Sequence, residues 1–189
     1  PTFVSPKVKV ADEYGNSLPK GEVGRLMVKG PTVFKGYWNL HEKLHGVVVD
    51  GWWWTGDMAR QDEKGRFYQI DREVDVVQSR HGPVYGLPLE EELLKCDDVA
   101  EATIIGIEHP ELGLLPVAIA HSKSGDGLND EAILQQVNSQ FPKEQQVYSL
   151  IDVKSTAGIP RGLTGKILKR QLREHYANHF ANNKGQQAA

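Results

Sequence analysis

A segment near the C-terminus, residues 160–170, places two glycines and a lysine just ahead of an apolar stretch with helical spacing. The apolar positions of that stretch are Ile167, Leu168, Leu172 and Tyr176. The pattern predicts a loop followed by a helix that begins near Lys166. A helix N-terminus is partly positive, so a lysine there is unfavourable unless an anion joins it, and free backbone N–H groups favour the same anion. Lys166 is therefore either part of an anion site or a solvated charge at a frayed helix end.

The segment is not a P-loop, since that motif needs a glycine, four residues, Gly-Lys and then a serine or threonine. Pro160 stands at the first glycine position, and Ile167 follows the lysine where a hydroxyl is needed for magnesium. The chain also lacks a Gly-x-Ser-x-Gly elbow and a Gly-x-Gly-x-x-Gly fingerprint after a strand. A hydrolase triad and a Rossmann site are both unsupported.

Asp57 and Arg72 are the next candidates for ligand binding. Asp57 follows three tryptophans, a threonine and a glycine, and an ionised carboxylate there could accept hydrogen bonds from both hydroxyls of a ribose. Alternatively it is an ordinary turn residue that bonds its own backbone. The planar fork of Arg72 could bind a phosphate or a ribose oxygen, or it could pair with a neighbouring carboxylate such as Asp71.

Other polar side chains have simpler interpretations. His81 lies in a predicted loop, where a bystander role is more common than catalysis. His41 and His45 are four residues apart but have no acidic partner at ligand spacing, so no metal site is expected. Residues 90–92, all glutamates, read as the charged side of a short helix, and Cys96 as a core residue.

Composition narrows the class of protein further. The chain has 189 residues, of which 25% are charged, and a formal net charge of −3, which suits one domain or two small ones. The slightly acidic balance argues against nucleic acid or an anionic membrane as the main partner. One cysteine excludes a disulfide framework, and no signal peptide or apolar run of about 18 residues is visible. We therefore expect a cytoplasmic protein without a membrane span.

The first half of the chain reads as short strands joined by turns. Alternating side chains at residues 7–10 and 25–29 predict two strands, and residues 58–61 and 66–70 flank a turn to form a hairpin. A small β-barrel or a meander fits this rhythm.

The second half changes to mixed strands and helices. Strands are expected at residues 74–79, 102–107, 115–120 and 147–153, and helices at residues 87–95 and 129–141. Asn129 caps the longer helix, which buries Ile133, Leu134, Val137 and Phe141. This order predicts an α+β domain with one sheet covered by helices. Residues 181–189 lack apolar content and are expected to form a flexible tail.

Several of these features belong to one series of motifs. The series is Gly21-Glu22-Val23-Gly24-Arg25-Leu26, Lys35-Gly36-Tyr37-Trp38-Asn39, Gly51-Trp52 with Thr55-Gly56-Asp57, Gly65-Arg66-Phe67, Asp71-Arg72 and Thr164-Gly165-Lys166-Ile167-Leu168-Lys169-Arg170. In this order and spacing it resembles the adenylate-forming superfamily, which includes acyl- and aryl-CoA synthetases, firefly-luciferase-like enzymes and peptide-synthetase adenylation domains. The resemblance extends over about residues 8–176.

The resemblance implies a division of the chain. Residues 1–71 would be the last β-barrel subdomain of the large N-terminal adenylation domain, residues 72–75 the hinge, and residues 76–180 a mobile C-terminal lid domain. The fold class would be α+β, with a small β-barrel subdomain followed by a lid whose central sheet is covered by helices.

The resemblance also implies roles for individual residues. Asp57 would hold the ribose hydroxyls of ATP and Arg72 the ribose or α-phosphate side, with Thr164 and Gly165 also among the nucleotide-binding residues. Lys166 would be catalytic, reaching the acyl carboxylate and the bridging phosphate oxygen while an acyl-AMP forms. The lid would then swing so that a thiol of CoA or of a phosphopantetheine arm attacks the acyl-AMP.

Parts of the family pattern lie outside this chain. The phosphate loop and the segment that contact magnesium, adenine and the acyl pocket precede residue 1 in the family. The chain alone is therefore expected to be inactive, either as a piece of a longer ligase or as one subunit of a split one, and its partners would be that N-terminal domain, a carboxylic acid and, in some members, a carrier protein.

Three places depart from the family pattern and leave other functions open. Val74 stands where the hinge usually carries lysine or aspartate, and the glycine-pair loop beside the thiol channel reads Arg80-His81-Gly82-Pro83, with Gly86-Leu87-Pro88 in place of the following Pro-x-Glu. The alternative is a non-catalytic, lid-like module that docks a carrier protein or a partner subunit. A luciferase-type monooxygenase is a third possibility, supported only by kinship.

Overall fold

The structure, a computed structural model, describes residues 5–35, 47–155 and 158–182. The chain divides into two compact units, Pro1–Val74 and Asp75–Ala189. His41 and His45, most of the Lys35–Asn39 motif and residues 183–189 of the predicted tail lie outside the described residues.

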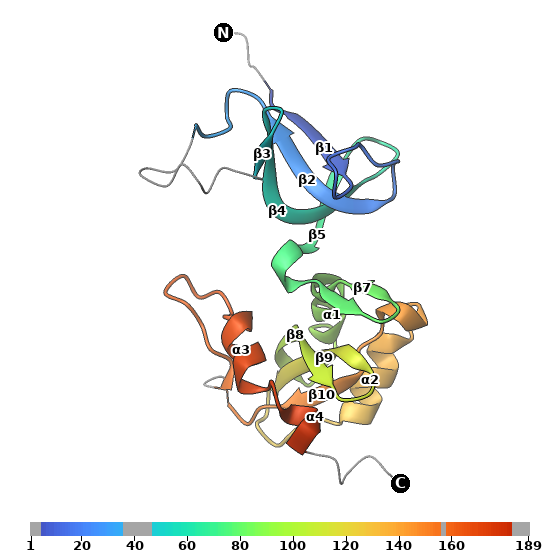
Figure 1. The fold of residues 1–189 in the computed structure, drawn as a ribbon. Coiled ribbons are helices and arrows are strands. Elements are labelled where there is room, and N and C mark those ends of the chain that lie inside the picture. Colours follow the sequence, from blue (N-terminus) through green and yellow to red (C-terminus); the bar gives the residue numbers. More distant parts are fainter. Residues whose placement is uncertain (1–4, 36–46, 156–157, 183–189) are drawn as a thin grey trace. The chain divides into compact units, whose positions relative to one another are not determined.

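The first unit is built on one antiparallel sheet. Its strands are β1 (Lys7–Ala11), β2 (Val23–Lys29), β3 (Val48–Val49), β4 (Trp52–Gln61) and β5 (Phe67–Arg72). The order is β1-β2-β4-β3, and β5 pairs with the C-terminal half of β4. Long β2 and β4 curl together (Figure 1). The predicted strands and hairpin are confirmed, but the described strands form a curled open sheet, so only this part of the predicted barrel is seen.

The hairpin between β4 and β5 is fixed by its turn residues. The Asp62 carboxylate accepts hydrogen bonds from the Arg66 backbone N–H at 2.8 Å and from the Arg66 Nε at 2.7 Å. Gly65 has a φ of +82°, a conformation that side chains disfavour. The turn sets the register of the pair as far as Ala59 opposite Gln69, and a one-residue bulge at Ile70 then brings Asp57 opposite Arg72.

The second unit is an α+β domain. Its elements are β6 (Val77–Ser79), β7 (Gly82–Val84), α1 (Gly86–Leu93), β8 (Val99–His109), β9 (Gly113–Ser122), α2 (Asp130–Asn138), β10 (Ser149–Asp152), α3 (Lys169–His175) and α4 (His179–Asn182). Strands β8 and β9 form an antiparallel hairpin, and β10 adds in parallel to β9. Strands β6 and β7 make a separate two-stranded sheet.

Helices cover both faces of the central sheet because its apolar side chains alternate. Ile104, Ala118 and Ala120 face the first core with α1 and α2, which contribute Leu89, Leu93, Ile133 and Val137. Ile105, Val117 and Ile119 face a second core with Leu172 of α3 and Phe180 of α4. The α+β layout predicted for this half is confirmed.

Several predicted boundaries were wrong by a few residues. The strand expected at 74–79 is limited to β6, since Glu73–Asp75 form a 3₁₀ turn. The helix capped by Asn129 ends at Asn138, although its cap is present: the Asn129 side chain accepts from the Ala132 N–H. Ala181, assigned to the tail, lies in α4. Within the described ranges, no helix is both long and apolar enough to span a bilayer.

Candidate functional site

Asp57 is displayed by an irregularity in β4. Arg25 of β2 lies opposite Met58 and Met27 lies opposite Trp54, so three residues of β4 oppose the single Leu26. The bulged residues are Thr55, Gly56 and Asp57. The Thr55 hydroxyl closes the bulge by donating to the Leu26 carbonyl at 3.0 Å and accepting from the Asp57 N–H at 3.1 Å. Bulges of this kind re-aim a side chain, and here the side chain is the Asp57 carboxylate.

Arg72 and Asp57 meet across the β4–β5 pair. Arg72 Nε lies 3.3 Å from Asp57 Oδ1, and Gln69 Nε2 donates to the same oxygen at 3.3 Å. The Arg72 side chain is 56% exposed, and Gly56 beside it has a φ of +79°. Within the described part of the chain, Asp57 Oδ2 makes no hydrogen bond. One carboxylate oxygen therefore holds an accessible guanidinium, and the other is left as an acceptor.

A pocket lies beside the bulge. Its volume is about 340 Å³ and its lining includes Arg25, Trp53, Trp54 and Glu73. The Arg25 guanidinium stacks 3.3 Å from the Trp54 ring centre and its Nη2 pairs with Glu73 at 2.6 Å. This cluster was not predicted, because two charged residues that are 48 positions apart leave no local signal in the sequence.

Lys166 lies in a tight hairpin loop and not at the start of a helix. The Gly162 N–H donates to the Lys166 carbonyl at 2.9 Å, and the Gly165 N–H donates to the Gly162 carbonyl at 2.9 Å. Arg161 and Ile167 form an isolated antiparallel β-bridge at the base of the loop. Gly165 has a φ of +80°. Helix α3 begins only at Lys169, so the predicted helix start near Lys166 was wrong. Instead the loop presents Lys166, Thr164 and Gly165 as exposed residues.

Two glutamates tie the base of this loop to the domain. Arg161 pairs with Glu101 of β8, and its other arm donates to the Gly165 carbonyl. Lys169 pairs with Glu90 of α1 at 2.7 Å. The interpretation of residues 90–92 as one charged helix side was wrong for Glu90, whose side chain is only 13% exposed.

Comparisons with known proteins identify the family. No protein-family model matches the chain. Feruloyl-CoA synthase from Amycolatopsis sp is 31% identical over 176 residues, which cover 93% of this chain and 35% of that enzyme. ATP-bound MatB from Rhodopseudomonas palustris has a TM-score of 0.84 at 31% identity, covering 95% of this chain and 36% of MatB. The o-succinylbenzoate CoA synthetase MenE from Bacillus subtilis, solved with its acyl-adenylate intermediate, has a TM-score of 0.80 at 28% identity, covering 92% of this chain and 34% of MenE.

The chain belongs to the adenylate-forming superfamily. It spans about a third of the length of the curated relatives it matches and corresponds to their C-terminal part. The resemblance inferred from the motif series is thereby confirmed, and the shared segment runs through both units.

The adenylate-forming motifs of this chain fall into two groups. Asp57 and Arg72 lie together in the first unit, whereas Lys166, Thr164 and Gly165 lie in the loop of the second. Among the described residues, no three His, Cys, Asp or Glu side chains form a metal-binding group. The chain's own candidate groups are therefore a carboxylate, a guanidinium and an ammonium.

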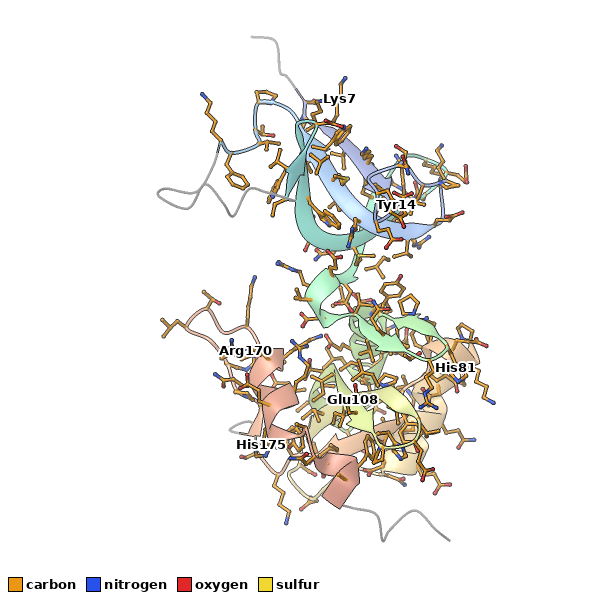
Figure 2. All side chains as sticks on the ribbon, viewed as in Figure 1. Lys7, Tyr14, His81, Glu108, Arg170 and His175 are labelled. Atoms are coloured by element: carbon orange, nitrogen blue, oxygen red, sulfur yellow. The ribbon has the colours of Figure 1, made fainter. Side chains whose placement is uncertain are left out.

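The segment that departs from the family pattern, residues 80–88, forms the turn between β6 and β7, strand β7 and the start of α1. His81 lies at the turn between β6 and β7, exposed (Figure 2), and its backbone N–H donates to the Ser79 hydroxyl. Gln145 clamps β7 by donating to the Pro83 carbonyl at 2.6 Å. A Pro-x-Glu sequence is present two residues further along, as Pro88-Leu89-Glu90.

Proposed function

We propose that this chain is the C-terminal part of an ATP-dependent carboxylate-activating ligase that forms an acyl-AMP and transfers the acyl group to a thiol. The observation that supports this most directly is the Asp57–Arg72 pair on the β4 bulge, in a chain that matches ATP-bound MatB over 95% of its length. The upstream two thirds of the ligase would supply the magnesium, adenine and acyl-pocket contacts.

The nucleotide-binding residues fit a ribose and a phosphate chemically. Asp57 Oδ2 makes no hydrogen bond among the described residues and can accept from a ribose hydroxyl. The exposed Arg72 fork can donate to a second ribose oxygen or to the α-phosphate. Because Arg72 is already held by Asp57, little side-chain freedom is lost when a nucleotide binds.

Lys166 is proposed to act during adenylate formation. Its loop is closed by backbone hydrogen bonds, and its ammonium is exposed with no ion pair among the described residues. A compact ammonium can stabilise the negative charge that develops on the bridging phosphate oxygen and can hold the attacking carboxylate. Thr164 and Gly165 would approach the nucleotide from the same loop.

The two units are proposed to move relative to each other about residues 72–75. Arg72 is the last residue of β5 and Glu73–Asp75 form a short 3₁₀ turn, with the Val74 side chain 75% exposed. Short segments at the end of an element commonly absorb the rotation in domain closure. We also propose that upstream residues complete the curled sheet of the first unit into a barrel.

The acceptor is proposed to be CoA, with a phosphopantetheine arm as the alternative. Feruloyl-CoA synthase and MenE carry CoA in their names, and a second MenE structure holds ATP and magnesium. A carboxylic acid would be the other substrate, and the enzyme would act in the cytoplasm, where ATP and CoA are both available.

The test uses the full-length protein that contains this chain. We expect ATP–pyrophosphate exchange that depends on an added carboxylic acid, assayed with a panel of aryl, short-chain and long-chain acids. The chain of 189 residues alone should give no exchange. No acid-dependent exchange by the full-length protein, together with ATP-independent binding to a carrier protein, would instead indicate the non-catalytic docking module.

A further inference from the structure

The loop that carries Lys166 leads directly into helix α3, and the first residue of that helix is a lysine, whose positive charge is unfavourable at a helix N-terminus. Lys169 is the first residue of this helix, and no side chain caps the helix N-terminus. Since a helix N-terminus is partly positive, a lysine there repels it unless a carboxylate is close. The neighbouring Arg170 is exposed (Figure 2), but Lys169 is turned into the domain.

Glu90 of α1 supplies that carboxylate. Its Oε1 lies 2.7 Å from the Lys169 Nζ, and the two side chains are only 13% and 15% exposed. Solvent screening of this pair is weak, so the attraction depends strongly on keeping both charges.

The same oxygen also joins α1 to the central sheet. The Ile104 N–H of β8 donates to Glu90 Oε1 at 2.7 Å, and the fully buried Thr103 hydroxyl donates to it at 2.9 Å. These two hydrogen bonds hold the Glu90 carboxylate on the sheet independently of its contact with Lys169. One carboxylate links α1, β8 and the first residue of α3.

We infer that Glu90 is a positioning residue for Lys166, acting through Lys169. Only Ile167 and Leu168 separate the two lysines, and the Leu168 N–H donates to the Pro160 carbonyl at 2.8 Å, so the loop and the helix start form one stiff piece. Further along α3, the buried Leu172 holds the middle of the helix but not its first turn. The Glu90–Lys169 pair holds the first residue of α3, while the Arg161–Glu101 pair and the packing of Ile167 on the second core hold the base of the loop.

This inference rests on the proposed function, because it concerns the lysine assigned to adenylate formation. It predicts an effect on turnover in the first half-reaction. Since a misplacement of about 1 Å at a reacting group can cost roughly 100-fold in rate, we expect kcat for pyrophosphate exchange to fall about 10- to 100-fold when the pair is broken. The KM for ATP should change less than about twofold, since Asp57 and Arg72 are untouched.

The variants are made in the full-length protein. Glu90→Gln keeps an acceptor for the Ile104 N–H and the Thr103 hydroxyl but removes the charge facing Lys169. Lys169→Met removes the positive charge of the pair, and Lys169→Arg keeps it on a different side chain. Glu91→Gln is the matched control, since it neutralises the next glutamate of α1, which is exposed. The double variant Glu90→Gln/Lys169→Met should be no slower than either single variant, because both remove one interaction.

Three measurements separate positioning from simple destabilisation. Exchange turnover should fall in Glu90→Gln and Lys169→Met, partly recover in Lys169→Arg and stay unchanged in Glu91→Gln. Thioester formation from supplied acyl-AMP should stay within about twofold, because that step does not use Lys166 in the proposed mechanism. Amide hydrogen exchange should speed up in residues 162–170 and not in β8 or β9.

Two sets of results would overturn the positioning role of Glu90. Full exchange turnover in Glu90→Gln and Lys169→Met, or an equal loss in both half-reactions together with a lower Tm, overturns the inference. Lys166→Ala measured in parallel isolates the proposed function. If that variant keeps full exchange activity, the proposed function fails, whereas an inactive Lys166→Ala beside a fully active Glu90→Gln overturns only the positioning role.

Discussion

Replacing Asp57 with asparagine should weaken ATP binding strongly while leaving the fold nearly unchanged. The Asp57–Arg72 pair is a surface pair, with side chains 23% and 56% exposed, so its loss should cost only about 0–1 kcal/mol of stability. A hydrogen bond from a ribose hydroxyl to an ionised carboxylate contributes about 1.5–3 kcal/mol. At about 1.4 kcal/mol per tenfold change, ATP affinity should fall roughly 10- to 150-fold.

The assay is the KM for ATP in pyrophosphate exchange by the full-length protein, set beside the Tm of each variant. Asp62→Asn is the matched control from the same hairpin. Desolvation raises the pKa of Asp62, but hydrogen bonds from the Arg66 backbone and side chain and from Tyr68 outweigh it and lower that pKa, so this carboxylate supports the turn. Asp62→Asn should lower Tm and leave the KM for ATP unchanged. If Asp57→Asn left the KM unchanged, or lowered Tm as much as Asp62→Asn does, the nucleotide role of Asp57 would be refuted.

Three further predictions concern the second unit. Leu172→Ala removes a side chain that is 1% exposed and should lower the free energy of unfolding, measured in urea, by about 2–5 kcal/mol. Leu163→Ala, at a fully exposed loop tip, should change that free energy by less than about 0.5 kcal/mol. Equal effects of the two variants would contradict the packing described for α3. Burial lowers the pKa of His179 from its ordinary value near 6.5, so the folded chain favours the neutral ring. The stability that this preference contributes is present above about pH 6.5 and is lost as the pH falls below that value. His179→Gln should therefore flatten the curve of unfolding free energy against pH in that range. Burial also raises the pKa of the Cys96 thiol, so Ellman's reagent should label it only in denaturant, and rapid labelling of the native chain would place the thiol elsewhere.

Periodic patterns in the sequence predicted much of the fold. Alternation at residues 7–10 and 25–29 and the Asp62 turn located the strands of the first unit, and the apolar runs at residues 102–107 and 115–120 located the paired strands of the second. These predictions succeeded because side-chain period and turn chemistry act within a few residues. Element ends were less accurate, since tertiary contacts decide them.

The sequence supplied the candidate residues of the site but not the way in which the backbone holds them. Asp57, Arg72 and Lys166 were identified from their motifs, yet the sequence could not show that three residues of β4 oppose one residue of β2. It also placed Lys166 at a helix start, because the apolar spacing continues through Ile167 and Leu168 although the backbone there turns back on Pro160.

Long-range charge pairs were the largest omission. Glu90 pairs with Lys169, which lies 79 positions further along the chain, and nothing in the sequence near either residue distinguishes it from a solvated charge. Only the packing of α1, α3 and β8 brings them together. Such pairs cannot be read from periodicity.

The central claim is that Lys166 serves adenylate formation and not the later acyl transfer. The most direct measurement compares Lys166→Ala with the unaltered full-length protein in the two half-reactions separately. We predict that acid-dependent pyrophosphate exchange falls by at least about 100-fold, within the usual range for the loss of one preorganised charge-stabilising group, while thioester formation from supplied acyl-AMP is retained. Unchanged pyrophosphate exchange in Lys166→Ala would contradict the account.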